Sequence, residues 1–300
     1  MKRKIVFVVN PIAGTRSKND LQQYLEKRTA AAGIDFIVMH SDPDGDYGPL
    51  KIVIDKQHIT DVVVCGGDGT ISALAGALIG TKVNIGIIPV GSGNGLARAA
   101  CIPLKPSKAL EIVFANNATE VDGFYINRQY SCMLSGLGFD AQIAHNFAKN
   151  SRRGLITYTR ESLMHFFKAK PYQFEIEVNG FSFYTDAFFI SIANSNQFGN
   201  NFTIAPKASL TDGLLDIVIV QKMNKARLPF AILKQVRGNN TLQELVDTIS
   251  KRNVVYFQVP EIKIRNIQYA PLHIDGDPRE TADDFDIQIV PKAMRLLMPN

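Results

Sequence analysis

Residues 62–78 read VVVCGGDGTISALAGAL and decide the fold of the first part of the chain. The apolar run 62–65 predicts a buried strand, and a glycine-rich turn, 66–70, follows it. After the turn, the apolar residues Ile71, Leu74, Ala75 and Leu78 have the spacing of one buried face of a helix. A buried strand, a glycine turn and a helix N-terminus are therefore expected in direct succession.

This turn favours a phosphate ligand. Its glycines leave backbone N–H groups uncovered, and the start of the helix adds partial positive charge. Asp68 would repel a phosphate unless a cation such as Mg²⁺ lay between them, as in nucleotide sites. The turn is therefore interpreted as a cradle for a Mg²⁺-nucleotide. The alternative is a tight strand-to-helix turn in which Thr70 caps the helix.

A second glycine turn strengthens this interpretation. Residues 83–90 predict another strand, the loop 91–95 reads GSGNG, and a short helix is expected after it. Ser92 offers a hydroxyl to a phosphate, and Asn94 offers an amide to a phosphate or a ribose. Because sequential strands in such sheets usually neighbour each other, the two turns are expected side by side.

Strand and helix patterns alternate in the first part of the chain. Apolar strands recur at 4–9, 35–39, 61–65 and 85–90, with helix-compatible stretches between them. This rhythm is typical of a parallel sheet covered on both faces. We expect an α/β nucleotide-binding domain over residues 1–122.

After about residue 122 the pattern becomes mainly β. Asn179-Gly180 between two alternating runs is a strong hairpin signal. We expect a mainly antiparallel β domain over 123–300, whose final residues either stay with it or pack back on the first domain. Its strands are expected at 174–178, 181–192, 214–220, 254–259, 261–264 and 287–290.

Composition fits a globular enzyme. The 300 residues are 46% hydrophobic and 20% charged, and no apolar run approaches the ~20 residues of a membrane span. The net charge of +5 is mild, and no recognisable nucleic-acid motif occurs, so nucleic acid is not expected as a partner. The five histidines show no zinc spacing, and the three cysteines are interpreted as thiols in a reducing cytoplasm.

Two segments combine basic residues with apolar anchors. The first surrounds Phe166-Phe167, and the second contains Phe230 and Leu233 beside Lys234 and Arg237. Either these segments dock on an anionic bilayer, or they are amphipathic helices with a solvated basic face. Docking would make the protein cytoplasmic and peripherally membrane-associated.

The two glycine turns resemble those of the diacylglycerol kinase catalytic domain superfamily, which includes bacterial lipid kinases and sphingosine kinases. The resemblance covers nearly the whole chain. It includes the segments NPIAG at 10–14, GGDGT at 66–70, PVGSGN at 89–94, GLGFDA at 136–141, 194–199, 205–206, DGLLD at 212–216 and DGD at 275–277. The resemblance departs at two positions. Gly95 stands where bacterial diacylglycerol kinases more often have an acid, and Asp277 stands where the family motif usually has a glutamate.

The resemblance implies an ATP-dependent lipid kinase with a two-domain architecture similar to that of lipid kinases and NAD kinases. Nucleotide is then expected in the cleft between the domains, and the acceptor lipid on the second domain. The candidate nucleotide-binding residues are Asn10, His40, Gly66, Gly67, Asp68, Gly69, Thr70, Ser92, Gly93 and Asn94. His40 either lines the adenine pocket or is a plain surface residue.

The resemblance also assigns roles to the acids. It places Asp68 and Asp122 in a Mg²⁺-linked network, and it assigns the base that activates the lipid hydroxyl to Asp275 or Asp277. We predict direct contact with the acceptor hydroxyl for Asp277 and an orienting, Mg²⁺-supporting role for Asp275. Asp212 either binds a second, structural Mg²⁺ or forms an Asp-Gly turn.

Three functions remain open. The first is a lipid kinase acting on diacylglycerol, a sphingoid base or a related lipid. The second is an NAD kinase, although the Asn-Glu dipeptide of those enzymes does not occur in this sequence. The third is a non-catalytic module that binds lipid or nucleotide, against which the retained acids argue.

Overall fold

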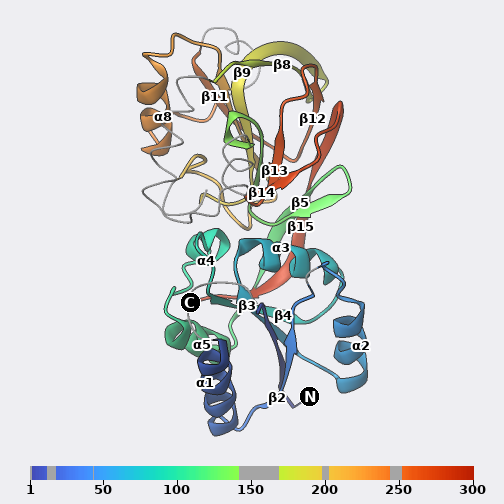
Figure 1. Ribbon diagram of the computed structural model, residues 1–300. Coiled ribbons are helices and arrows are strands. Elements are labelled where there is room, and N and C mark those ends of the chain that lie inside the picture. The colour runs from blue at the N-terminus through green and yellow to red at the C-terminus, as the bar shows by residue number, and fades with distance from the viewer. Residues whose placement is uncertain (1, 12–17, 43, 142–168, 198–202, 244–251) are drawn as a thin grey trace. The chain divides into compact units, whose positions relative to one another are not determined.

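The computed structural model describes residues 2–11, 18–42, 44–141, 169–197, 203–243 and 252–300 (Figure 1). Their contacts form two compact units. The first spans Met1–Gly123 and Pro291–Asn300, and the second contains the other described residues between Phe124 and Val290. The division falls inside two strands, β5 (Ala118–Ile126) and β15 (Asp284–Leu297).

The first unit is a parallel sheet with strand order β2-β1-β3-β4, and the last part of β15 pairs in parallel with β4. All six residues of β3 are buried, which explains the apolar run of branched side chains in its sequence. The strands are β1 (Lys4–Val9), β2 (Asp35–His40), β3 (Asp61–Gly66) and β4 (Asn84–Pro89). The four strands predicted here are confirmed to within about two residues.

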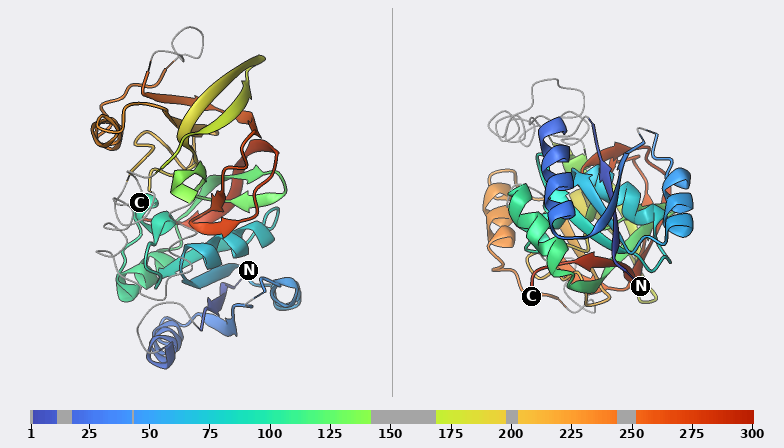
Figure 2. Two further views of the ribbon diagram at one scale, coloured as in Figure 1. Left: turned by 45° about the horizontal axis from the view of Figure 1, so that its top comes forward. Right: turned by 90° about the horizontal axis from the view of Figure 1, so that it is seen from below.

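Helices cover both faces of this sheet. In Figures 1 and 2, α1 and α5 lie on one face and α2 lies on the other. The helices are α1 (Lys18–Ala31), α2 (Gly48–Gln57), α3 (Asp68–Ala77), α4 (Gly95–Ala99) and α5 (Pro106–Ala115). The α/β prediction for the first part of the chain is therefore confirmed.

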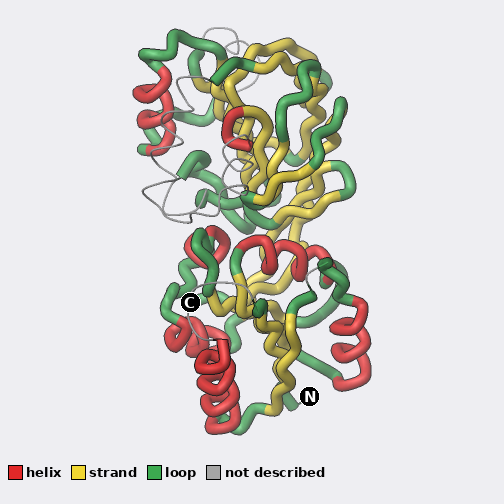
Figure 3. The backbone as a smooth tube through the Cα atoms, in the orientation of Figure 1, coloured by secondary structure: helices red, strands yellow, loops and turns green. Residues whose placement is uncertain are grey.

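The second unit is mainly strand, as the yellow tube of Figure 3 shows. Its ladders β13-β7-β9-β8-β12-β15 are antiparallel throughout, and β10 joins β9 to β11. The strands are β6 (Gln129–Ser131), β7 (Leu134–Gly138), β8 (Tyr172–Val178), β9 (Phe181–Ala193), β10 (Leu215–Gln221), β11 (Val254–Val259), β12 (Glu261–Asn266), β13 (Leu272–Ile274) and β14 (Asp277–Arg279). The predicted antiparallel β unit is confirmed.

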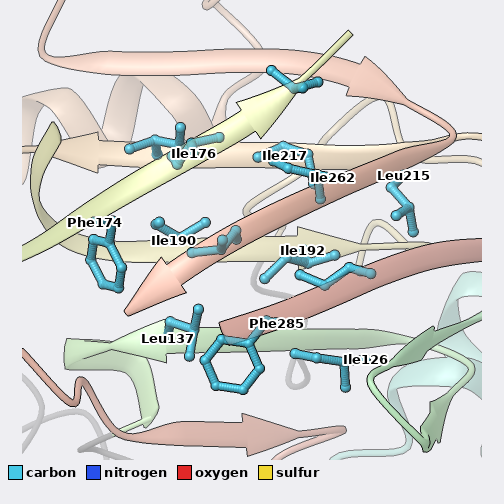
Figure 4. Close-up of a cluster of buried hydrophobic side chains, with 14 of the residues drawn as sticks. Ile126, Leu137, Phe174, Ile176, Ile190, Ile192, Leu215, Ile217, Ile262 and Phe285 are labelled. Carbon is cyan, nitrogen blue, oxygen red and sulfur yellow. The ribbon is translucent and has the colours of Figure 1, made fainter. Parts of the chain in front are cut away.

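Alternation along these strands builds the core of the second unit. In β8 the residues Phe174, Ile176 and Val178 are buried, whereas the residues between them are not. They pack with side chains from β7, β9, β10, β12 and β15 (Figure 4). The β8–β9 hairpin turns at Asn179 (φ 50°) and Gly180 (φ 78°), as the Asn-Gly signal predicts.

Candidate active site

The first glycine turn joins β3 to α3. Gly67 is the extended N-cap residue, and α3 begins at Asp68, so the carboxylate lies in the first helical turn. Thr70 is therefore not the cap, and its Oγ1 accepts a hydrogen bond of 2.7 Å from Asn10 Nδ2. The expectation that Thr70 caps the helix is wrong. Residues 67–70 are half-buried, which leaves the helix N-terminus accessible to an anion.

The second turn is closed by its own asparagine. Asn94 adopts a left-handed conformation (φ 51°) as the N-cap residue of α4. Its Oδ1 accepts from Gly91 N at 3.0 Å, and its Nδ2 donates to Gly91 O at 2.8 Å. This buried amide therefore fixes the shape of the loop, while Ser92 is exposed.

The two turns are in direct contact, as expected from their order in the chain. β3 and β4 pair in parallel up to Gly66 and Pro89, where both turns begin. A Cβ on Gly91 would lie 2.5 Å from Gly67 Cα, so only glycine allows this approach of the two backbones.

Asp68 faces the second turn. A Cβ on Gly93 would lie 2.9 Å from Asp68 Oδ2, and Leu96 N donates to Asp68 Oδ1 at 3.4 Å. The carboxylate is thereby held beside both loops. It is the only acid among the candidate nucleotide-binding residues, and it can bind a cation that an anionic ligand brings.

Two further candidates lie at the same edge of the sheet. Asn10 follows β1, donates its backbone N–H to Cys65 O and reaches Thr70 through its side chain. His40 ends β2 opposite Val9 and is exposed. The structure thus brings Asn10 and Thr70 together and leaves His40 open to solvent on the neighbouring strand.

Sequence reasoning missed Arg98. This half-buried residue on α4 donates from Nε to Gly93 O at 3.2 Å, which adds a cation next to the second turn. Arg98 lies five residues after Gly93, about one helical turn beyond the glycine motif. A cation at this spacing could have been identified from the sequence, because a guanidinium beside a phosphate-binding loop suits an anion.

Asp122 is a buried residue of β5. Its Oδ1 accepts from Lys292 N at 2.8 Å, and Lys292 has a left-handed φ of 54°. This carboxylate therefore ties β5 to the backbone of β15 within the first unit.

The two C-terminal acids differ in environment. Asp275 is buried, and its carboxylate accepts from Ser131 Oγ at 2.7 Å and from the backbone N–H groups of Met133 and Leu134 at 3.1 and 3.0 Å. Asp277 follows two residues later with 55% of its side-chain surface exposed. Partial burial raises the pKa of the Asp277 carboxyl, and the charges of Arg279 and His273 oppose this shift.

Asp212 forms an Asp-Gly turn, because its Oδ1 accepts from Leu214 N at 3.1 Å and Gly213 has φ 71°. Gln258 Nε2 connects it with a second acid, at 3.5 Å from Asp212 Oδ2 and 3.0 Å from Asp216 Oδ2. Burial raises the pKa of Asp216 to about 6, and the nearby Asp212 charge adds to this shift. Asp212 therefore forms the Asp-Gly turn and also lies close to the second acid, Asp216.

Some predictions concern residues that the structure leaves undescribed. They include part of the opening motif at 12–14, the end of the motif at 194–199 and most of the first basic segment, with Arg152, Arg153, Arg160, Phe166, Phe167 and Lys168. Among the residues that are described, no helix has the length and apolar character needed to cross a membrane.

Comparisons with known proteins agree with this architecture. The model of the diacylglycerol kinase catalytic domain matches residues 4–126, and that of the YegS C-terminal NAD kinase beta sandwich-like domain matches residues 134–298. The chain is 30% identical over 278 residues to a protein of Salmonella arizonae named "Probable lipid kinase YegS", covering 88% of this chain and 87% of that protein. A YegS-like relative from Chromohalobacter salexigens is 28% identical over 279 residues, which cover 91% and 86% of the two chains.

A crystal structure of a diacylglycerol kinase from Bacillus anthracis superposes with a TM-score of 0.76 over 99% of this chain and 97% of that one. At 20% sequence identity, this likeness concerns the fold alone. The two-domain architecture expected from the sequence is therefore confirmed.

Proposed function

We propose a reaction for this chain, which belongs to the YegS lipid kinase family and is a lipid kinase with a diacylglycerol kinase catalytic domain. The chain transfers the γ-phosphoryl group of ATP to the hydroxyl of diacylglycerol, a sphingoid base or a related lipid. The observation that carries this proposal is the packed pair of glycine turns with Asp68 between them.

The residues of the two turns fit a Mg²⁺-nucleotide. The N-terminus of α3 and the Arg98 guanidinium suit phosphate oxygens, and the Asp68 carboxylate suits Mg²⁺. Within the described parts of the chain, no group of three or more His, Cys, Asp or Glu side chains could hold a metal ion. A Mg²⁺ ion that arrives with the nucleotide phosphates needs only one or two protein carboxylates, which this turn provides.

When bound, ATP with Mg²⁺ supplies the phosphoryl group and the charge neutralisation on its oxygens. The chain's own residues position the phosphates through the helix N-terminus and through loops whose backbones are locked together. Asn10 orients Thr70 beside the turn. Asp122 is assigned to the Mg²⁺-linked network on the family resemblance, while its carboxylate accepts from Lys292 N.

For the base, the environments of the two C-terminal acids favour Asp277. Asp275 is buried, and its carboxylate oxygens already accept from several N–H and O–H donors of the chain. Asp277 is accessible, and a raised pKa makes its carboxylate a better acceptor for the proton of a lipid hydroxyl. Asp275 then orients the loop that carries Asp277.

Asp277→Asn is expected to lower kcat by about 10²–10⁴-fold, the usual contribution of a general base, while nucleotide affinity stays near wild type. Asp277→Glu, which gives the side chain of the family motif that this segment resembles, should preserve or raise activity. Asp275→Asn should mainly lower the melting temperature, because an acceptor for four donors is weakened. Steady-state kinetics and thermal melts distinguish these results, and full activity of Asp277→Asn would remove Asp277 as the base.

A lipid acceptor requires access to a membrane, and we assign this contact to α8 (Leu228–Val236). Its inner face is anchored, since Leu228 and Gln235 are buried and Gln235 Nε2 donates to Ile204 O at 2.9 Å. Its outer face exposes 75% of Phe230 and 45% of Leu233 beside the exposed Lys234 and Arg237. The segment 222–237 contains five basic residues and no acid, which suits peripheral binding to an anionic bilayer.

Reversing Lys234 and Arg237 to glutamate should weaken binding to phosphatidylserine vesicles by at least 30-fold, since each lost cation near the surface is worth about 1 kcal/mol. Added salt should shrink the difference, and a soluble short-chain substrate should react normally. The matched control is the same charge reversal at the exposed Lys51 and Lys56 of α2. Vesicle sedimentation measures the binding. An equal loss in both double variants would mean that α8 does not dock on the bilayer and that its basic face is solvated.

The reaction itself is tested by ATP turnover on mixed lipid micelles and, separately, on NAD, each with and without Mg²⁺. The proposal predicts Mg²⁺-dependent turnover on the micelles and none on NAD. Turnover on NAD and none on the micelles would refute lipid kinase activity and identify the protein as an NAD kinase.

A further inference from the structure

A buried acid–histidine pair lies in the second unit, outside the candidate residues discussed above. His273 on β13 and Asp140, two residues after the end of β7, approach within 3.5 Å between Nε2 and Oδ2. Their side chains are 1% and 7% exposed. Burial raises the pKa of the Asp140 carboxyl, and the neighbouring His273 opposes this shift. Such a pair is costly to bury, so its role in the fold needs an explanation.

Gly136 makes room for the pair. On the antiparallel ladders, His273 pairs with Gly136, and Gly136 pairs with Ser191 of β9, so the three positions share one row of the sheet. A Cβ on Gly136 would overlap Asp140 Oδ2 and lie 2.6 Å from His273 Nε2. The missing side chain of Gly136 therefore creates the space that Asp140 and His273 fill.

The other ring nitrogen of His273 holds the turn after β13. Gly276 N donates to His273 Nδ1 at 3.3 Å, so Nδ1 is an acceptor. In the neutral ring the proton is then on Nε2, which faces the Asp140 carboxylate. Asp140 is itself fixed, because its Oδ1 accepts from Ala141 N at 2.7 Å.

This turn carries the proposed base. Asp275 (φ 50°) and Gly276 (φ 86°) form a two-residue hairpin turn between Ile274 and Asp277, which pair across it. The Asp275 carboxylate holds one side of the turn against the β6–β7 connection, and the His273 ring holds the other side through Gly276. Asp277 is the next residue, so its direction depends on both anchors.

We propose that Asp140 and His273 are positioning residues that hold the Asp275–Gly276 turn, and through it Asp277, in the geometry required for phosphoryl transfer. The inference rests on the proposed function, because it assumes that Asp277 contacts the lipid hydroxyl. Neither residue of the pair exchanges a proton with substrate. Asp140 orients the imidazole, and the imidazole fixes the amide of Gly276.

Two substitutions at one position separate the two contacts of the ring. Asparagine places its Oδ1 as many bonds from Cβ as Nδ1, so His273→Asn keeps an acceptor for Gly276 N. Glutamine places its Nε2 as many bonds from Cβ as the ring Nε2, so His273→Gln keeps only the contact towards Asp140. We expect kcat of His273→Asn within about threefold of wild type and a loss of at least tenfold in His273→Gln, since a displacement of ~1 Å can cost up to 10²-fold.

Two further readouts separate positioning from a general structural role. The KM for ATP should stay unchanged in both variants, and hydrogen exchange of the Gly276 amide should accelerate in His273→Gln but not in His273→Asn. Equal kcat values in both variants, or unchanged exchange in His273→Gln, overturn the inference. Failure of the proposed function is distinguishable, because a wild-type protein without lipid phosphorylation refutes that function while the amide exchange still reports whether His273 holds the turn.

Discussion

Replacing Asp68 with alanine is expected to lower the rate of lipid phosphorylation by roughly 10³-fold or more while the protein stays folded. Loss of a carboxylate from a nucleotide-bound Mg²⁺ should remove several kcal/mol of transition-state stabilisation. The fold should tolerate the change, because Asp68 is only half-buried. Single-turnover kinetics over a Mg²⁺ titration measure the loss.

The matched control for this variant is Asp55→Ala, which removes an exposed acid from α2 and should leave turnover unchanged. Circular dichroism of both variants establishes that they are folded. Wild-type turnover in folded Asp68→Ala would remove the main support for a Mg²⁺-nucleotide at this turn.

Gly91→Ala is expected to have the second large effect, a loss of at least 10-fold in nucleotide affinity. The new methyl group would lie 2.5 Å from Gly67 Cα, which is backbone and cannot rotate away. The two turns must then separate, although β3 and β4 are paired up to Gly66 and Pro89. A shift of ~1 Å in one loop displaces the groups that position the phosphates.

The control is Gly45→Ala, where φ is +77° but no heavy atom lies within 4 Å of the added Cβ. This variant should lose about 1 kcal/mol of stability and no nucleotide affinity, since it carries backbone strain without a close approach. Calorimetric titration with an ATP analogue compares the two. Equal nucleotide affinities in both variants would mean that contact between the turns does not shape the site.

The first unit was predictable because β1, β3 and β4 are almost entirely buried and therefore appear as continuous apolar runs. The shortest strands of the second unit were not predictable. β14 contains only Asp277–Arg279, and its three residues adopt a strand because β13 pairs with them. β15 continues through Pro291 and a left-handed Lys292, residues that on sequence alone end a strand.

At the candidate site, the contact of the two glycine turns was predictable from strand order, whereas side-chain roles were not. The donors that hold Asp275 come from residues 131–134, more than 140 positions earlier in the chain. Likewise, the space over Gly136 for Asp140 and His273 depends on the pairing of β7 with β13. Local sequence patterns carry no record of such distant contacts.

The most direct test of the central claim is the transfer of ³²P from ATP into a total lipid extract, with the label placed at the γ-position in one reaction and at the α-position in another. The account predicts Mg²⁺-dependent labelling of a lipid from the γ-labelled nucleotide only, with wild-type protein and not with Asp68→Ala. No labelled lipid with folded wild-type protein, or equal labelling by Asp68→Ala, would contradict it.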